Sequence, residues 1–267
     1  MWYDLNFAFA HTVQREKITT TMPLEKFQAI VLSNSAYGES DRIVSLFTLE
    51  QGRLKGFARG ARNSRKRFGP ALETCARIDT QLNHTDGLSS VRSADIITVY
   101  SGIRSNLNAI AHALYACELV ECLTPEGHPL PRLYRLLITY LEWLDSGSTG
   151  ESGRRMFEIN LLNILGYRPS LETCSRCGAD FDGRGALMQQ GGELACRFCA
   201  GTGRTIPAVA LQKLAHCLAT GRFGQVEFVP EDLSAAGQLL DESLAGHSSR
   251  RLKSLEFLQQ TCDTCST

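Results

Sequence analysis

The sequence of 267 residues has no long hydrophobic run, and this absence argues against a membrane-spanning protein. A helix needs about 20 consecutive apolar residues to cross a bilayer, and the apolar runs of this chain are far shorter. The first residues carry neither a basic segment nor a small-residue cleavage site. We therefore expect no secretory signal, no membrane partner and a cytoplasmic location.

Common signatures of enzymes are missing as well. The sequence contains no GxxxxGK[ST] phosphate loop, no GxSxG nucleophile elbow and no HExxH metal motif. Its six histidines are scattered and have no obvious serine or cysteine partner in sequence. We predict that the protein is not an enzyme, although catalytic groups from distant positions can still meet in three dimensions.

Net charge is absent from the chain as a whole, but the charges are unevenly distributed. The 28 basic and 28 acidic side chains balance, yet no acidic residue occurs between positions 51 and 72. A neutral total therefore does not exclude an anionic partner, because the distribution of charge matters more than its sum. The basic residues of this segment are Arg53, Lys55, Arg59, Arg62, Arg65, Lys66 and Arg67.

The residue pattern changes near position 101. Before it, short runs of β-branched and aromatic residues alternate with turn sequences, which predicts five strands and an OB-type barrel. After it, apolar residues recur at helical spacing in six segments. We predict a multidomain α+β protein with an extension (1–24), an OB-fold barrel (25–101), a helical domain (102–171 and 205–260), a four-cysteine zinc ribbon (172–204) and a tail (261–267).

Two CxxC pairs interrupt the helical region: Cys174 with Cys177, and Cys196 with Cys199, with 18 residues between the pairs. A CxxC turn places two sulfurs on one side of the chain, each ~2.3 Å from a shared ion, and two such turns complete a tetrahedron. We predict a closed structural Zn²⁺ site at which no catalysis occurs. The alternatives are a metal-free ribbon, redox-active CxxC motifs or two disulfides.

The other cysteines give weaker signals. Two of them are five residues apart in a predicted helix, a spacing that does not place both thiols on one face. We predict buried free thiols at Cys75, Cys117, Cys122 and Cys217. The third CxxC pair, Cys262 and Cys265, could bind a metal, but a solvated tail explains it better.

The basic segment also contains Phe57 and Phe68, and its glycines allow a backbone to approach closely. Cations beside aromatic rings on a barrel form a groove that suits a phosphate backbone with stacked bases. We therefore predict nucleic-acid binding by the seven cations, with little sequence preference because no base-reading motif is present. A solvated charged loop is the alternative.

Three stretches of the chain, residues 37–72, 157–178 and 250–258, resemble the RecO family of recombination mediators and occur in the family's order. They carry YGESDRIVSLFTLEQGRLKGFARGARNSRKRFGPAL, FEINLLNILGYRPSLETCSRCG and RRLKSLEFL. The resemblance implies an OB-fold domain, a helical domain and a zinc-binding insertion. All four ribbon cysteines are present in this chain.

The same resemblance implies binding of single- and double-stranded DNA, annealing of complementary strands, and a complex with RecR that helps to load RecA onto DNA coated with single-stranded-DNA-binding protein. It leaves open whether RecF takes part. It also implies that the acidic tail of the single-stranded-DNA-binding protein contacts the helical domain, where Arg155 matches a basic position; an ordinary exposed helix arginine is the alternative. Competing functions are a DNA-processing enzyme, such as a nuclease or glycosylase, and a transcription-associated zinc-ribbon module.

Overall fold

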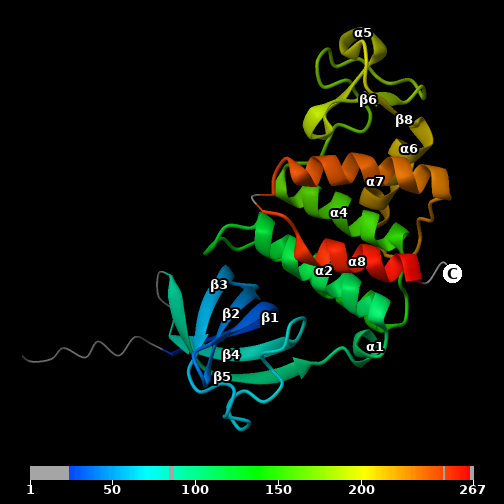
Figure 1. The fold of residues 1–267 in the computed structure, drawn as a ribbon. Coiled ribbons are helices and arrows are strands. Elements are labelled where there is room, and N and C mark those ends of the chain that lie inside the picture. Colours follow the sequence, from blue (N-terminus) through cyan, green and yellow to red (C-terminus); the bar gives the residue numbers. More distant parts are fainter. Residues whose placement is uncertain (1–23, 84–86, 249, 265–267) are drawn as a thin grey trace, which may run out of the picture.

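The computed structural model describes residues 24–83, 87–248 and 250–264 of the chain. Residues 1–23 of the predicted extension (1–24) lie outside the described residues, as do Cys265 and the side chain of Cys262. A barrel lies at one end of the molecule, a small β-ribbon at the other, and a group of helices between them (Figure 1). This order of barrel, helices and ribbon confirms the predicted fold class.

The first five strands form a closed barrel in the order β1-β2-β3-β5-β4. All neighbouring strands are antiparallel except β3 and β5. A register shift between Val31 and Ser33 allows the first half of β1 to pair with β4 and its second half with β2. The strands are β1 (Leu24–Tyr37), β2 (Asp41–Thr48), β3 (Gly52–Ala58), β4 (Arg77–Asn83) and β5 (Leu88–Thr98).

The β1–β2 hairpin is longer than its turn-rich composition predicts. The sequence of residues 35–40 predicts a turn between two strands. In the structure, however, Ser35 pairs with Ile43 and Tyr37 pairs with Asp41. Only residues 38–40 form the turn. The backbone stays extended because each residue up to Tyr37 finds a partner in β2, so the hairpin carries the Tyr37 ring to the end of the barrel.

All six predicted helices are present, and a short additional helix precedes them. The side chain of Asn106 accepts hydrogen bonds from two backbone N–H groups at the start of α2, and Pro131 and Pro230 occupy first turns. No helix of the described residues is long and apolar enough to span a membrane. The helices are α1 (Ser101–Arg104), α2 (Leu107–Leu123), α3 (Pro131–Asp145), α4 (Glu151–Leu165), α6 (Ala208–Thr220), α7 (Pro230–Ala245) and α8 (Lys253–Thr264).

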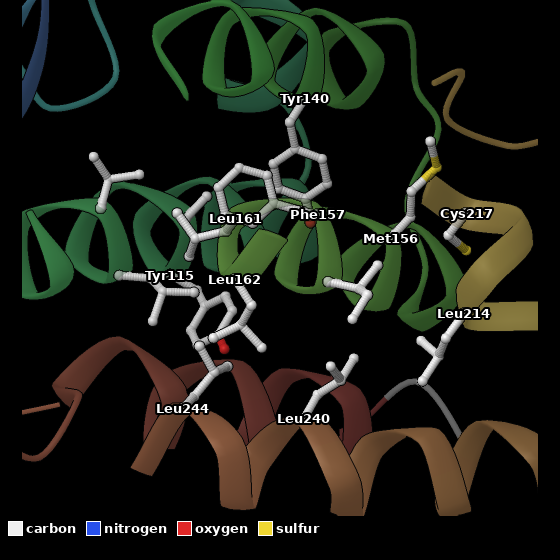
Figure 2. Close-up of a cluster of buried hydrophobic side chains, with 14 of the residues drawn as sticks. Tyr115, Tyr140, Met156, Phe157, Leu161, Leu162, Leu214, Cys217, Leu240 and Leu244 are labelled. Carbon is white, nitrogen blue, oxygen red and sulfur yellow. The ribbon is translucent and has the colours of Figure 1, made fainter. Parts of the chain in front are cut away.

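The helices enclose one continuous apolar core (Figure 2). Aromatic side chains at its centre come from three helices, with Tyr140 of α3 stacked on Phe157 of α4 at 4.7 Å between ring centroids. Leu214 of α6 and Leu240 of α7 complete this region. The core therefore joins α3, α4, α6 and α7 into one unit.

The outer face of the barrel also contributes to this core. Ile30, Leu32 and Phe47 project from β1 and β2 into the helical cluster, where Phe47 contacts the ring of Tyr134. At Gly52 a Cβ atom would lie 1.9 Å from a backbone carbonyl oxygen of the α2–α3 loop, so only glycine permits this approach. The barrel is thus packed directly against the helices.

The ribbon lies between α4 and α6 and contains a three-stranded sheet in the order β7-β6-β8. Its side chains Phe181, Leu194 and Ile206 are buried in the helical core. The N–H group of Gly191 donates to Glu242 of α7 at 3.0 Å, which adds a polar anchor. The elements are β6 (Ala186–Met188), η1 (Gln190–Gly192), β7 (Leu194–Ala195), α5 (Arg197–Ala200) and β8 (Arg204–Ile206).

Candidate metal centre and nucleic-acid interface

Four cysteine sulfurs converge in the ribbon beside α5. The Sγ atoms of Cys174, Cys177, Cys196 and Cys199 all lie within 4.8 Å of one another. The distance from Cys177 Sγ to Cys196 Sγ is 3.8 Å. A tetrahedral ion with metal–sulfur bonds of ~2.3 Å separates its sulfur ligands by about 3.8 Å. The cluster therefore has the spacing of a closed metal site with four thiolates.

The backbone around the first CxxC turn favours metal binding by Cys174. Gly178 has a φ of 72° and donates its N–H to the Cys174 carbonyl, which closes the turn. A hydrogen bond from the Cys196 N–H lowers the pKa of the Cys174 thiol to about 6, which favours the thiolate that a metal requires. Hydrogen bonds with Cys177 and Cys196 raise the pKa of Cys199 to about 12.

The seven predicted DNA-binding cations separate into two groups. Arg53 and Lys55 lie in β3, and their charged ends are 3.1 and 2.8 Å from Oε1 of Glu126 in the helical domain. Arg53 also donates to the carbonyl of Thr124 at 2.9 Å. The hydrogen bond from Lys55 and the charge of Arg53 lower the pKa of Glu126. Arg53 therefore connects the barrel to the helical domain, a role that the sequence pattern does not predict.

The remaining cations follow β3 in the β3–β4 loop (residues 59–76). All five are exposed, and none forms an ion pair with a carboxylate of the described chain. Their charge is therefore available to an anionic ligand. We refer to Arg59, Arg62, Arg65 and Lys66 as the loop cations.

Hydrogen bonds hold the loop against the β1–β2 turn. Oδ1 of Asp41 accepts the N–H of Gly60 at 2.7 Å, and this contact lowers the pKa of Asp41. The N–H of Arg62 donates to the Ser40 carbonyl, and Arg67 donates to the carbonyl of Arg59. Arg67, although exposed, therefore shapes the loop that presents the loop cations.

Two aromatic rings lie at this end of the barrel. Tyr37 and Phe57 meet edge to face, with 5.7 Å between ring centroids and 86° between planes. Tyr37 is 55% exposed, and the turn-rich sequence around it gave no sign that it belongs to the site. Phe68 lies beneath the Arg67 guanidinium but is buried in the barrel core, so the prediction that its ring is available for a base to stack on is wrong.

Arg155 is buried in the helical domain, which rules out the alternative that it is an ordinary exposed helix arginine. Its side chain is 7% exposed, and Nη1 donates to Glu158 at 2.8 Å and to Asp241 at 2.7 Å. There is room for the guanidinium because α7 presents Gly237, whose missing side chain would clash with it. Binding of an acidic peptide at Arg155 stays a prediction, and such a peptide would compete with two carboxylates of the chain itself.

Comparison with known proteins gives consistent matches along the chain. The family described as "Recombination protein O N terminal" matches residues 22–100, and "Recombination protein O C terminal" matches residues 104–256. A protein named "DNA repair protein RecO" from Pelobacter propionicus is 59% identical over 88% of this chain and 96% of its own length. Proteins of the same name from Geobacter sulfurreducens and Myxococcus xanthus are 50% and 38% identical, each over 87% of this chain and 96% of its own length.

Proposed function

Since this chain belongs to the RecO family of DNA repair proteins, we propose that it is a recombination mediator that binds single- and double-stranded DNA and anneals complementary strands. It acts in the bacterial cytoplasm, where with RecR it helps to load RecA onto DNA coated with single-stranded-DNA-binding protein. The observation that carries the proposal is the exposed group of loop cations beside the Tyr37–Phe57 pair.

Electrostatics supports DNA binding at this end of the barrel. Each cation that neutralises a phosphate of a single strand releases counterions and contributes about −0.7 to the log–log salt slope. The four loop cations therefore predict a slope of about −3. The same charges lower the repulsion between two strands that approach for annealing. An exposed aromatic ring adds a stacking surface for a base without selecting its identity.

We propose Zn²⁺ as the resident metal of the ribbon. Four thiolates at tetrahedral spacing suit zinc or iron and not magnesium or calcium, and their closed arrangement leaves no position for substrate. When bound, the ion cross-links the two CxxC turns. The ribbon and the barrel lie at opposite ends of the molecule (Figure 1), which supports a structural role for the metal.

A strand-annealing assay without nucleotide tests the proposal. Labelled complementary oligonucleotides should form duplex faster with the protein than without it, and the rate should fall as salt increases. A DNA-processing enzyme would instead release shortened strands or free bases, and a transcription-associated module would do neither. Failure to bind oligonucleotides even at low salt overturns the proposal.

The proposed protein partners require a second experiment. Immobilised protein should retain RecR and a peptide with the acidic tail of the single-stranded-DNA-binding protein, in separate pull-downs with and without DNA. We propose that the helical domain receives the tail and that Arg155 takes part. Arg155→Lys keeps a positive charge but cannot form the same paired hydrogen bonds, so it should weaken capture of the peptide and leave capture of RecR unchanged. If the unaltered protein and Arg155→Lys capture the peptide equally, Arg155 takes no part in binding it.

A further inference from the structure

Two thiols from different domains meet where the barrel contacts the helices. Cys75 lies in the β3–β4 loop and Cys117 in α2, and their sulfurs are 3.6 Å apart. Both are free thiols in the structure. We propose that Cys75 and Cys117 are an oxidative modification site at which a peroxide forms a disulfide between the barrel and the helical domain.

The two sulfurs are already in contact, so little movement is required. A disulfide bond is about 2.05 Å long, and the sulfurs would therefore approach by roughly 1.5 Å. Both cysteines lie outside the ribbon cluster. Cys122, the next cysteine along α2, has its sulfur 2.9 Å from Nε of Arg250 and does not compete for Cys75. The geometry thus selects one partner for each thiol.

The backbone holds Cys75 in place. Its φ of 70° lies in the left-handed region that favours glycine, yet the position carries a thiol. Hydrogen bonds on both sides maintain this conformation: the Cys75 N–H donates to the Val31 carbonyl at 2.8 Å, and the Val31 N–H donates to the Ala76 carbonyl at 3.0 Å. The thiol is therefore presented to Cys117 by a backbone anchored in the barrel.

A cavity gives small molecules a route to one of the two thiols. Cys75 lines a cavity of about 270 Å³, together with Thr74, Tyr100 and Arg104. Cys117 does not line it and is fully buried. A peroxide that enters the cavity therefore meets Cys75 first, and Cys117 serves as the resolving thiol.

The reaction balances with hydrogen peroxide as the oxidant. The Cys75 thiolate attacks one oxygen, the O–O bond breaks, and the products are a sulfenic acid and a hydroxide that takes a proton to become water. The Cys117 sulfur then attacks the sulfenic sulfur, the S–O bond breaks, and the Cys117 proton leaves with the hydroxyl as a second water. The hydrogen bond with Cys75 and burial both raise the pKa of Cys117, which suits a thiol that keeps its proton until this step.

Peptide mapping of the full chain with its ribbon metal bound tests the proposal. After peroxide treatment, mass spectrometry under non-reducing conditions should find the peptides of Cys75 and Cys117 joined and two hydrogen masses lighter, and dithiothreitol should separate them. In Cys117→Ser the cross-link should be absent, and dimedone should label Cys75 as a sulfenic acid. Cys122→Ser is the matched control and should cross-link as the unaltered protein does.

Two results would overturn the proposal. One is a peroxide-treated protein whose Cys75 stays unmodified while other cysteines react. The other is a Cys75 that oxidises without joining Cys117. Mapping of the unaltered protein decides between cross-link and no cross-link even where Cys117→Ser folds poorly. Thermal unfolding gives a second readout, because a covalent link between the domains should raise Tm and its reduction should reverse the rise.

Discussion

The guanidinium of Arg155 and the carboxylate of Glu158 form an ion pair in the interior of the helical domain, with 2.8 Å between Nη1 and Oε2. Glu158 is fully buried and also accepts a hydrogen bond from the Tyr115 hydroxyl at 2.7 Å. Burial alone would raise the pKa of Glu158, but the charges of Arg155 and Arg154 lower it below its usual range. The carboxylate therefore stays ionised within an apolar core.

Replacement of Arg155 should destabilise the protein strongly. In Arg155→Met the Glu158 carboxylate would remain buried without the positive charge of Arg155 beside it. Loss of one partner from a buried ion pair costs about 3 kcal/mol. Urea unfolding at neutral pH measures the free energy. Arg251→Met is the control, because the Arg251 side chain is 84% exposed and its removal should cost less than about 0.5 kcal/mol. Similar losses in both variants would contradict a special role for the buried pair.

The local elements could be predicted because short-range patterns determine them. The helical period identified α3 and α7, Pro131 marked the start of α3, and turn residues separated the strands of the barrel. The metal cluster was predictable for the same reason, since two CxxC turns bring their own ligands together. The extended hairpin at residues 35–37 departed from this rule, because pairing with β2 overrode its turn-like composition.

Which cations form ion pairs within the protein could not be predicted, because their partners lie far away in sequence. Arg53 meets Glu126 at a separation of 73 residues, and Arg155 meets Asp241 at 86. A charge run in a sequence therefore shows how many cations are present but not which ones the fold neutralises. The Cys75–Cys117 contact, 42 residues apart, belongs to the same class.

Removal of three loop cations should weaken DNA binding and flatten its salt dependence. In a variant with Arg62, Arg65 and Lys66 changed to Ala, loss of three phosphate contacts should reduce the log–log salt slope by about 2. Fluorescence anisotropy with a single-stranded oligonucleotide over a salt series measures both quantities. The matched control changes the exposed arginines of the helical domain, Arg132, Arg135 and Arg222, and removes the same net charge. Equal losses of DNA affinity in the two triple variants would indicate nonspecific attraction by the whole protein and not a binding site at the loop cations.

The Tyr37 ring should contribute to binding of single strands without changing the salt dependence. Stacking of a base on an aromatic ring is worth about 1–3 kcal/mol, so Tyr37→Leu should lower single-strand affinity by at least several-fold. A duplex keeps its bases stacked inside, and its affinity should change less. Tyr37→Phe preserves the ring and should bind as the unaltered protein does. A loss in Tyr37→Phe equal to that in Tyr37→Leu would assign the effect to the hydroxyl instead.

Removal of the ribbon metal should lower stability and spare DNA binding at the barrel. Cys196→Ser deletes one of four ligands, and the ribbon residues packed into the helical core, such as Phe181 and Leu194, would lose their support. Metal analysis should find one zinc per unaltered chain, and the variant should lose both zinc and several degrees of Tm. Cys122→Ser lies outside the cluster and should keep its metal. Absence of zinc from native protein would refute the metal assignment.

Acid should destabilise the protein through a buried histidine. His112 of α2 lies in the helical core, where burial and the charge of Arg154 lower its pKa to about 4. Its Nδ1 is 3.3 Å from the Tyr140 hydroxyl. In the unfolded chain the pKa of histidine is about 6.5, so the unfolded state binds the extra proton between pH 6.5 and 4. Stability from this group is therefore present above pH 6.5 and is lost as pH falls towards 4.

Between pH 7.5 and 5 the loss attributable to His112 should be about 2 kcal/mol, since each pKa unit corresponds to 1.36 kcal/mol. Urea unfolding at both pH values measures this loss. The test compares the loss in the unaltered protein with the loss in a variant that lacks the histidine. His112→Gln removes the titrating group, so its stability should fall by about 2 kcal/mol less over this range than that of the unaltered protein. The exposed His128 provides the matched control, because His128→Gln should leave the pH dependence unchanged. If His112→Gln retained the full pH dependence, the acid sensitivity would have to arise from carboxylates, whose loss of charge lies at lower pH.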